Sequence, residues 1–153
     1  VDSQAAPVAR KLKQLGMNAQ LMGAGGFVSQ TFLTLAQREG EGVVALEPGL
    51  PVEQMPGGKA FEQAYQSRYH THIELHAPFA YDATRVLVAA MEKADSVDPA
   101  DYLPALRAIN YAGVTGQIAF DKEGNLKSPT FTVYKVVDGK WQPQTVLGGA
   151  TTK

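Results

Sequence analysis

The sequence predicts an α/β fold, with a parallel sheet that carries helices on both faces. Two observations favour this class. Over residues 1–50, amphipathic helical segments alternate with short apolar strands, and this alternation is typical of a parallel sheet whose strands are connected by helices. The chain has 153 residues, of which 44% are hydrophobic and 19% are charged, so it can bury a core without disulfides or structural metals.

Four elements are expected in the first third of the chain. Helices over residues 3–16 and 29–40 each begin at a serine that can cap them and stop at a glycine. Short apolar strands are expected within residues 18–24 and 42–48. The first strand runs into a glycine-rich loop, Gly23–Gly26.

The middle of the chain is expected to be helical. Residues 48–58 contain three prolines and three glycines, which predicts a linker or crossover. Helices should then cover residues 59–70, 76–94 and 98–109, and the longest of them keeps its apolar residues at the helical period. No strand is expected between Gly58 and Ala112.

The sequence of the last third of the chain predicts two strands separated by a turn, followed by a hairpin. A short strand over residues 114–120 is followed by turn residues Asp121–Asn125 and by a second strand over residues 130–137. The Asp138–Gly139 pair is typical of a two-residue hairpin turn, so a final strand should pair back on the second one. The tail, residues 148–153, is expected to fray.

Composition excludes several classes of function. The net charge is −1 and no block of like charges occurs, which disfavours a nucleic acid or an anionic membrane as the partner. The absence of cysteine excludes disulfides, cysteine-ligated metals and a thiol nucleophile. No apolar run approaches the roughly 20 residues of a membrane span.

Few side chains offer reactive chemistry. The three histidines in residues 70–76 have a spacing that could hold a metal, but a solvated helix end is the favoured interpretation. Glu47 and Glu53 are interpreted as surface charges, and Asp82, near the start of the long helix, as a structural residue. Because no paired acid and base and no catalytic motif occurs, we expect no catalytic residue, no metal, no cofactor and no enzymatic activity.

The loop Gly23–Gly26 lies between an expected strand and an expected helix, where backbone N–H groups can hold an anion. A dinucleotide-binding pattern would need a glycine at the position of Val28, so nucleotide binding is disfavoured. Two interpretations stay open, a tight turn and a loop whose missing side chains let a small molecule approach the backbone.

A set of short motifs in a fixed order carries a resemblance to a known family. Tyr81-Asp82-Ala83 stands on the long helix, and it is followed by Gly113-Val114-Thr115-Gly116, by Phe120-Asp121 and by Gly124-Asn125. In this order the motifs resemble the C-terminal part of periplasmic branched-chain amino-acid-binding proteins. These are the solute receptors of ABC importers, and their fold is the two-lobed type I periplasmic-binding-protein fold.

The resemblance implies how the chain divides between two lobes. Residues 1–50 would belong to the second lobe, residues 51–55 to a crossover, and the mostly helical residues 56–120 to the first lobe. Residues 121–129 would form the last crossover, and residues 130–153 the final strands and tail of the second lobe.

The resemblance also implies a function, which is to deliver branched-chain amino acids or a related small organic ligand to an ABC importer permease from the periplasm. The ligand-binding residues would be Gly25, Gly26, Phe27 and Phe79. In the family, this loop commonly carries an acidic residue for the ligand's ammonium group, and Gly25 stands at that position here. The alternatives are a nucleotide- or sugar-using α/β enzyme domain and the ligand-sensing domain of a signalling receptor.

Family members are longer than this chain, so we expect open sheet edges and uncovered apolar helix faces. Ala5, Val8 and Leu12 would lie on one such face, and Val86, Leu87 and Met91 on another. The chain on its own is therefore expected to self-associate by exchanging strands or larger elements.

Overall fold

The computed structural model describes residues 2–149 and divides the chain into two compact units. The first, here called the sheet unit, is formed by Val1–Leu50 and Thr130–Lys153, and the second, the helical unit, by Pro51–Pro129. Of the tail that was expected to fray, residues 150–153 lie outside the described residues. Within residues 2–149, no helix has the length and apolar character to cross a membrane.

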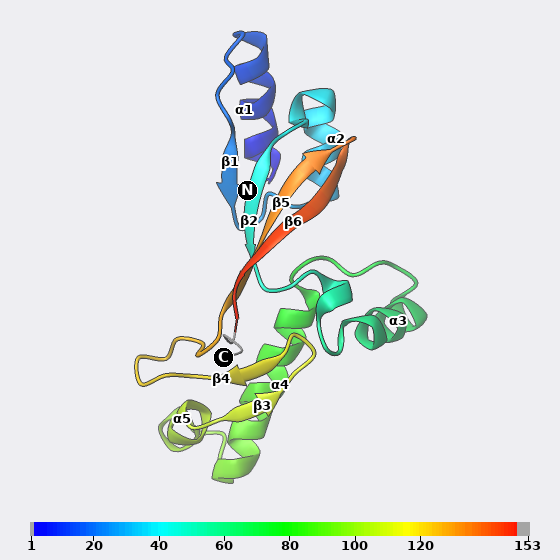
Figure 1. The fold of residues 1–153 in the computed structure, drawn as a ribbon. Helices are drawn as coiled ribbons and strands as arrows, with labels where there is room; N and C mark the ends of the chain where they lie inside the picture. The colour runs from blue at the N-terminus through cyan, green and yellow to red at the C-terminus, as the bar shows by residue number, and fades with distance from the viewer. Residues whose placement is uncertain (1, 150–153) are drawn as a thin grey trace. The chain divides into compact units, whose positions relative to one another are not determined.

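The sheet unit contains four strands in the order β1-β2-β5-β6 (Figure 1). β1 (Met22–Ala24) runs parallel to β2 (Val44–Pro48), whereas β5 (Thr130–Val137) and β6 (Lys140–Gly148) form antiparallel pairs. The α/β class is confirmed, but the sheet is mixed and not parallel throughout. A two-residue turn at Asp138–Gly139, with φ of 52° and 68°, joins β5 to β6, and so short a connection can only link antiparallel strands.

Two helices, α1 (Asp2–Gln14) and α2 (Gln30–Ala36), pack on this sheet, and a short 3₁₀ helix, η1 (Gln37–Gly40), follows α2. Their buried residues form one core with Val43, which directly precedes β2, and with Val136 of β5, and the helix residues of this core are Ala5, Ala6, Ala9, Phe32 and Ala36. Because α1 and α2 share this core, both lie on the same face of the sheet, although helices were expected on both faces. The small alanines of α1 let its backbone approach closely.

The serines that were expected to cap the two helices behave differently. Ser29 caps α2, because its hydroxyl oxygen accepts the N–H of Phe32 at 3.0 Å. Ser3 does not cap α1, since the helix already begins at Asp2, whose carboxylate accepts the N–H of Ser3 at 2.7 Å. The hydroxyl of Ser29 also donates to Asp2 at 2.8 Å, so the two helix starts are joined.

The helical unit contains four helices and two short strands: η2 (Val52–Gln54), α3 (Gly58–Tyr69), α4 (Ala77–Ala94), α5 (Pro99–Arg107), β3 (Asn110–Ala112) and β4 (Gln117–Ala119). β3 lies where no strand was expected, and it pairs antiparallel with β4. The strand that was predicted over residues 114–120 is also wrong in extent. Residues 113–116 instead form the turn of this hairpin, closed by a hydrogen bond of 2.9 Å from the Gly113 N–H to the Gly116 carbonyl.

Asp82 on α4 holds this turn. Its carboxylate is 2% exposed, and it accepts the N–H of Val114 at 2.9 Å, the N–H of Thr115 at 2.7 Å and the hydroxyl of Thr115 at 2.6 Å. A Cβ at Gly113 would stand 2.5 Å from the carboxylate, so only glycine fits there. Asp82 therefore has the structural role that its position in the sequence suggested.

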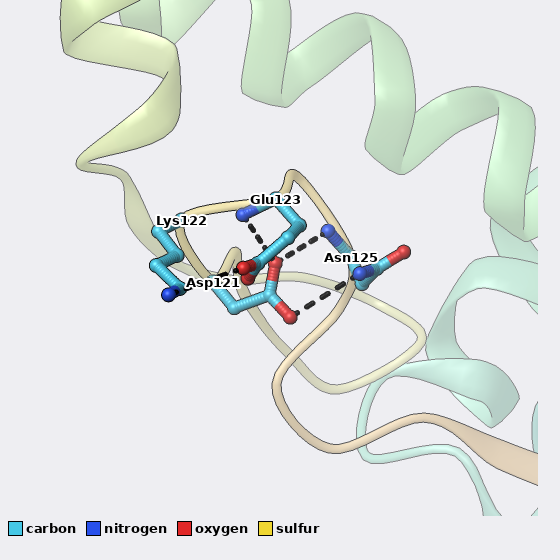
Figure 2. Close-up of polar contacts among 4 residues, drawn as sticks. All are labelled: Asp121, Lys122, Glu123 and Asn125. Atoms are coloured by element: carbon cyan, nitrogen blue, oxygen red, sulfur yellow. Dashed lines mark hydrogen bonds and ion pairs between the residues drawn. The ribbon is translucent and has the colours of Figure 1, made fainter.

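The segment that follows β4 turns at Asp121 (Figure 2). The Asp121 carboxylate accepts the backbone N–H groups of Asn125 at 2.8 Å and of Glu123 at 3.0 Å, and also the side-chain amide of Asn125 at 3.3 Å. The backbone bond from Asn125 is the main reason that the pKa of Asp121 is lowered. The turn is therefore stabilised above the ordinary pKa of aspartate, and this contribution is lost as the pH falls through the lowered pKa. The predicted turn over Asp121–Asn125 is confirmed.

Replacing the buried carboxylate of Asp82 should destabilise the protein. In Asp82→Asn, the amide keeps one oxygen acceptor and places an NH₂ group against N–H donors, so the free energy of unfolding should fall by about 2 kcal/mol. Asp101→Asn is the matched control, because Asp101 is exposed and accepts only the hydroxyl of Ser96 at 2.8 Å. Urea unfolding followed by circular dichroism measures both, and equal losses in the two variants would contradict the structural role of Asp82.

Candidate ligand-binding loop

The first half of the predicted loop Gly23–Gly26 belongs to β1, which ends at Ala24, and only Gly25 and Gly26 follow the carboxyl end of that strand and lead toward α2. The Gly25 N–H donates to the Leu46 carbonyl at 3.2 Å, which extends the pairing of β1 with β2 by one step beyond the strand. Gly25 and Gly26 have φ of +36° and +89°, a region that glycine adopts readily. In open α/β sheets, ligands bind outside the carboxyl ends of the parallel strands, and this loop occupies such a position.

Phe27 attaches the loop to the core. Its ring stacks on that of Phe32, with centroids 6.1 Å apart and an interplanar angle of 17°. A Cβ on Gly23 would lie 2.2 Å from the Phe27 ring, so the glycine permits this close approach. One part of the ring is therefore used in packing, and its role as a ligand contact stays a prediction.

The outer side of the loop is open. A Cβ built on Gly25 or on Gly26 would meet no heavy atom within 4 Å, and Gly25 is exposed. A small molecule could therefore approach the backbone of these two residues without meeting a side chain. This geometry agrees with the second interpretation of the loop, although the positive φ values show that a turn is formed as well.

Glu47 is not the surface charge that its place beside the linker suggested. Its side chain is 0% exposed, and its Oε1 accepts the N–H of Gly26 at 2.9 Å. The alternation of β2 explains the burial, because Val43, Ala45 and Glu47 point to the same face, where the cross-strand partner Thr132 is also fully buried. Within residues 2–149, its Oε2 has no hydrogen-bond partner.

The other residues singled out in the sequence lie in the helical unit. Phe79 is half-buried on α4, and Glu53 is exposed in η2. His70, His72 and His76 are all exposed, and His70 ends α3 in a left-handed conformation. In the part of the chain that the structure describes, no three histidine or acidic side chains come together in a group that could hold a metal ion.

A hollow in the sheet unit lies away from the loop. It is lined by Leu33, Gln37, Arg38, Glu41, Asp138 and Gly139. These residues precede β2 or turn between β5 and β6, so the hollow is at the amino end of β2, whereas the loop is at the carboxyl end of β1. The hollow and the glycine-rich loop are therefore separate features of the same unit.

Comparison with known proteins identifies a family that the chain matches. A sequence model of the family described as "periplasmic binding protein" matches residues 1–140. The leucine-, isoleucine-, valine-, threonine- and alanine-binding protein of Pseudomonas aeruginosa is 34% identical over 126 residues, which are 82% of this chain and 34% of that protein. The chain thus spans about a third of the length of this relative.

Solved structures share the fold. A leucine-binding protein, LivK, from Thermotoga maritima superposes with a TM-score of 0.83 at 23% identity, over 95% of this chain and 42% of that one. A second structure is that of LivJ, a branched-chain amino acid transporter substrate-binding protein from Streptococcus pneumoniae, in complex with isoleucine. Its TM-score is 0.78 at 20% identity, over 96% of this chain and 42% of that one. The predicted fold, that of type I periplasmic binding proteins, is confirmed.

The two glycines of the loop should respond differently to an added methyl group. Gly23→Ala forces the Phe27 ring out of its place and should lower the free energy of unfolding by about 1–3 kcal/mol. Gly25→Ala meets no atom and costs only the left-handed backbone, about 1–2 kcal/mol at most. Fluorescence of Trp141, whose ring is 5.3 Å from that of Phe32, reports unfolding of this core. A larger loss in Gly25→Ala than in Gly23→Ala would contradict the packing described.

Proposed function

The chain belongs to the periplasmic binding protein family, and from that premise we propose that it forms part of an extracytoplasmic receptor for an amino acid. The ligand is a branched-chain amino acid or a related small organic molecule, and the receptor delivers it to the permease of an ABC importer. The observation that carries this proposal is the identity of 34% with a protein that binds leucine, isoleucine, valine, threonine and alanine.

The geometry of the glycine-rich loop supports a binding role. Gly25 and Gly26 offer backbone to a ligand at the carboxyl end of β1, and Phe27 fixes the loop to the core. In this proposal Gly25, Gly26 and Phe27 are the ligand contacts of the sheet unit, and Phe79 is the ligand contact of the helical unit. The chain spans about a third of its Pseudomonas relative, so further parts of the receptor complete that site.

The alternatives have less support. The glycine pattern of a dinucleotide-binding enzyme is interrupted at Val28. The loop Gly23–Gly26 itself consists of three glycines and one alanine, so it supplies neither an acid nor a base. The family is one of solute-binding proteins, which favours a receptor without catalysis in the periplasm. A ligand-sensing domain of a signalling receptor would share the fold, but the Streptococcus protein named above is a transporter substrate-binding protein, which favours the transport role.

Calorimetry on the natural protein tests the proposed function. Leucine, isoleucine, valine, threonine and alanine are titrated, with glutamate as the control for a charged side chain. At least one of the five should bind saturably and stabilise the protein by about 2.7 kcal/mol at a concentration 100 times its Kd. If none of the five binds or raises the melting temperature, the proposed function is wrong.

We also propose that the 153-residue chain on its own self-associates through its sheet unit. Ala5 and Val86 are buried, which corrects the expectation for these two residues, whereas Val8, expected on the same face as Ala5, is exposed. The exposed apolar side chains of the sheet unit include Val8, Met22 and Phe131, at 48%, 59% and 40% exposed. Met22 lies on β1, which pairs on one side only, and free strand edges invite pairing with another copy.

Light scattering on this chain tests the self-association. The measured mass should exceed 16.4 kDa and rise with protein concentration. Met22→Lys places a charge on the edge strand β1 and should shift the mass toward the monomer, whereas the same change at exposed Gln14 on α1, which has no strand edge, serves as the control. A mass equal to the monomer at every concentration would rule out this form of association.

A further inference from the structure

Glu47 is a buried carboxylate that has been left partly unsatisfied. One oxygen accepts a single N–H, that of Gly26, and the other has no donor among the described residues. No lysine, arginine or histidine in residues 2–149 forms an ion pair with it. A carboxylate that is fully buried without a counter-charge is costly to the folded state, so a cation that binds nearby would offset part of that cost.

The hydrogen bond to Glu47 fixes the orientation of the peptide between Gly25 and Gly26. The N–H of Gly26 points at the carboxylate. In a planar trans peptide the carbonyl points the opposite way, so the carbonyl of Gly25 is directed away from Glu47. Gly25 is exposed, and no described residue donates a hydrogen bond to its carbonyl oxygen.

We propose that Glu47 is a positioning residue for a ligand that carries a primary ammonium group, and that it acts through the Gly25–Gly26 peptide. This inference rests on the proposed receptor function and adds the residue that orients the loop toward the ligand's charge. The carboxylate turns the Gly25 carbonyl outward and polarises it, because hydrogen bonds in a chain strengthen one another. The ammonium group donates to the Gly25 carbonyl oxygen. The buried carboxylate of Glu47, on the opposite side of the same peptide, stabilises the ammonium charge electrostatically.

The same arrangement explains how the loop can do without an acid of its own. A carboxylate at position 25 would contact an ammonium group directly, but Gly25 has no side chain. Glu47 brings a negative charge to the same loop from the neighbouring strand, 21 residues further along the chain. The group that Glu47 helps to hold is therefore the ammonium group of the ligand.

Glu47→Gln in the natural protein tests the proposal, because glutamine keeps an oxygen for the Gly26 N–H and removes only the charge. Three probes are titrated: leucine, 4-methylpentanoate, which lacks the ammonium group, and 3-methylbutylamine, which lacks the carboxylate. Affinity for leucine and for the amine should fall roughly 10- to 100-fold, and any affinity for 4-methylpentanoate should not fall. The melting temperature without ligand should stay the same or rise, since a buried unpaired charge has been removed.

Glu41→Gln is the matched control. Glu41 also accepts backbone N–H groups, from Asp138 at 3.1 Å and Gly139 at 3.2 Å, but it is exposed and lies at the other end of β2. Its replacement should leave all three affinities unchanged. A rescue variant, Glu47→Gln with Gly25→Asp, should recover part of the affinity for leucine, because aspartate tolerates left-handed backbone and its side chain enters open space.

The outcomes separate this inference from the proposed function. If the natural protein binds leucine and Glu47→Gln binds it equally well, the inference is wrong and the receptor function stands. A variant that loses stability together with affinity for all three probes shows that Glu47 is only structural, and this also overturns the inference. If the natural protein binds 3-methylbutylamine but none of the amino acids, the proposed function fails while the ammonium preference holds. Binding of 4-methylpentanoate alone overturns both.

Discussion

The hydrogen bond from the Gly26 N–H to the buried carboxylate of Glu47 is the constraint on which the candidate site depends. It joins the loop after β1 to the end of β2, and with the bond from Gly25 to Leu46 it holds two successive glycines against the neighbouring strand. Phe27 then closes the loop over Gly23 from the core side. The backbone of Gly25 is left open to solvent, and its carbonyl is directed away from the protein's own donors.

The helical unit uses a buried carboxylate in a different way. Asp82 accepts three hydrogen bonds from the turn between β3 and β4, so its bonding capacity is used within the unit. Glu47 accepts one and keeps an oxygen without a partner among the described residues. The Asp82 carboxylate therefore stabilises a turn, whereas the Glu47 carboxylate has an oxygen that could still interact with a bound ligand. Only Glu47 supports a proposal for ligand binding.

Local signals in the sequence predicted much of the fold. The Asp138–Gly139 hairpin follows from two residues that tolerate positive φ, and the glycine-rich loop from its place between a strand and a helix. β3 was missed because three residues are too few to show a strand pattern in the sequence, and their pairing depends on a turn at Val114 that is held by Asp82, 32 residues earlier in the chain. The burial of Glu47 was missed because its charge was given more weight than its alternation with Val43 and Ala45, which was the available signal.

The central claim is that the outward backbone of Gly25 and Gly26 receives the ligand. Nuclear magnetic resonance of the natural protein during a leucine titration tests this claim most directly, through the carbonyl ¹³C shift of Gly25 and the amide shifts of both glycines. The account predicts that these signals, with the side-chain carboxyl signal of Glu47, change together and saturate with binding. Saturable changes confined to other sites, such as the hollow beside Gln37 and Asp138, with Gly25 unaffected, would contradict it.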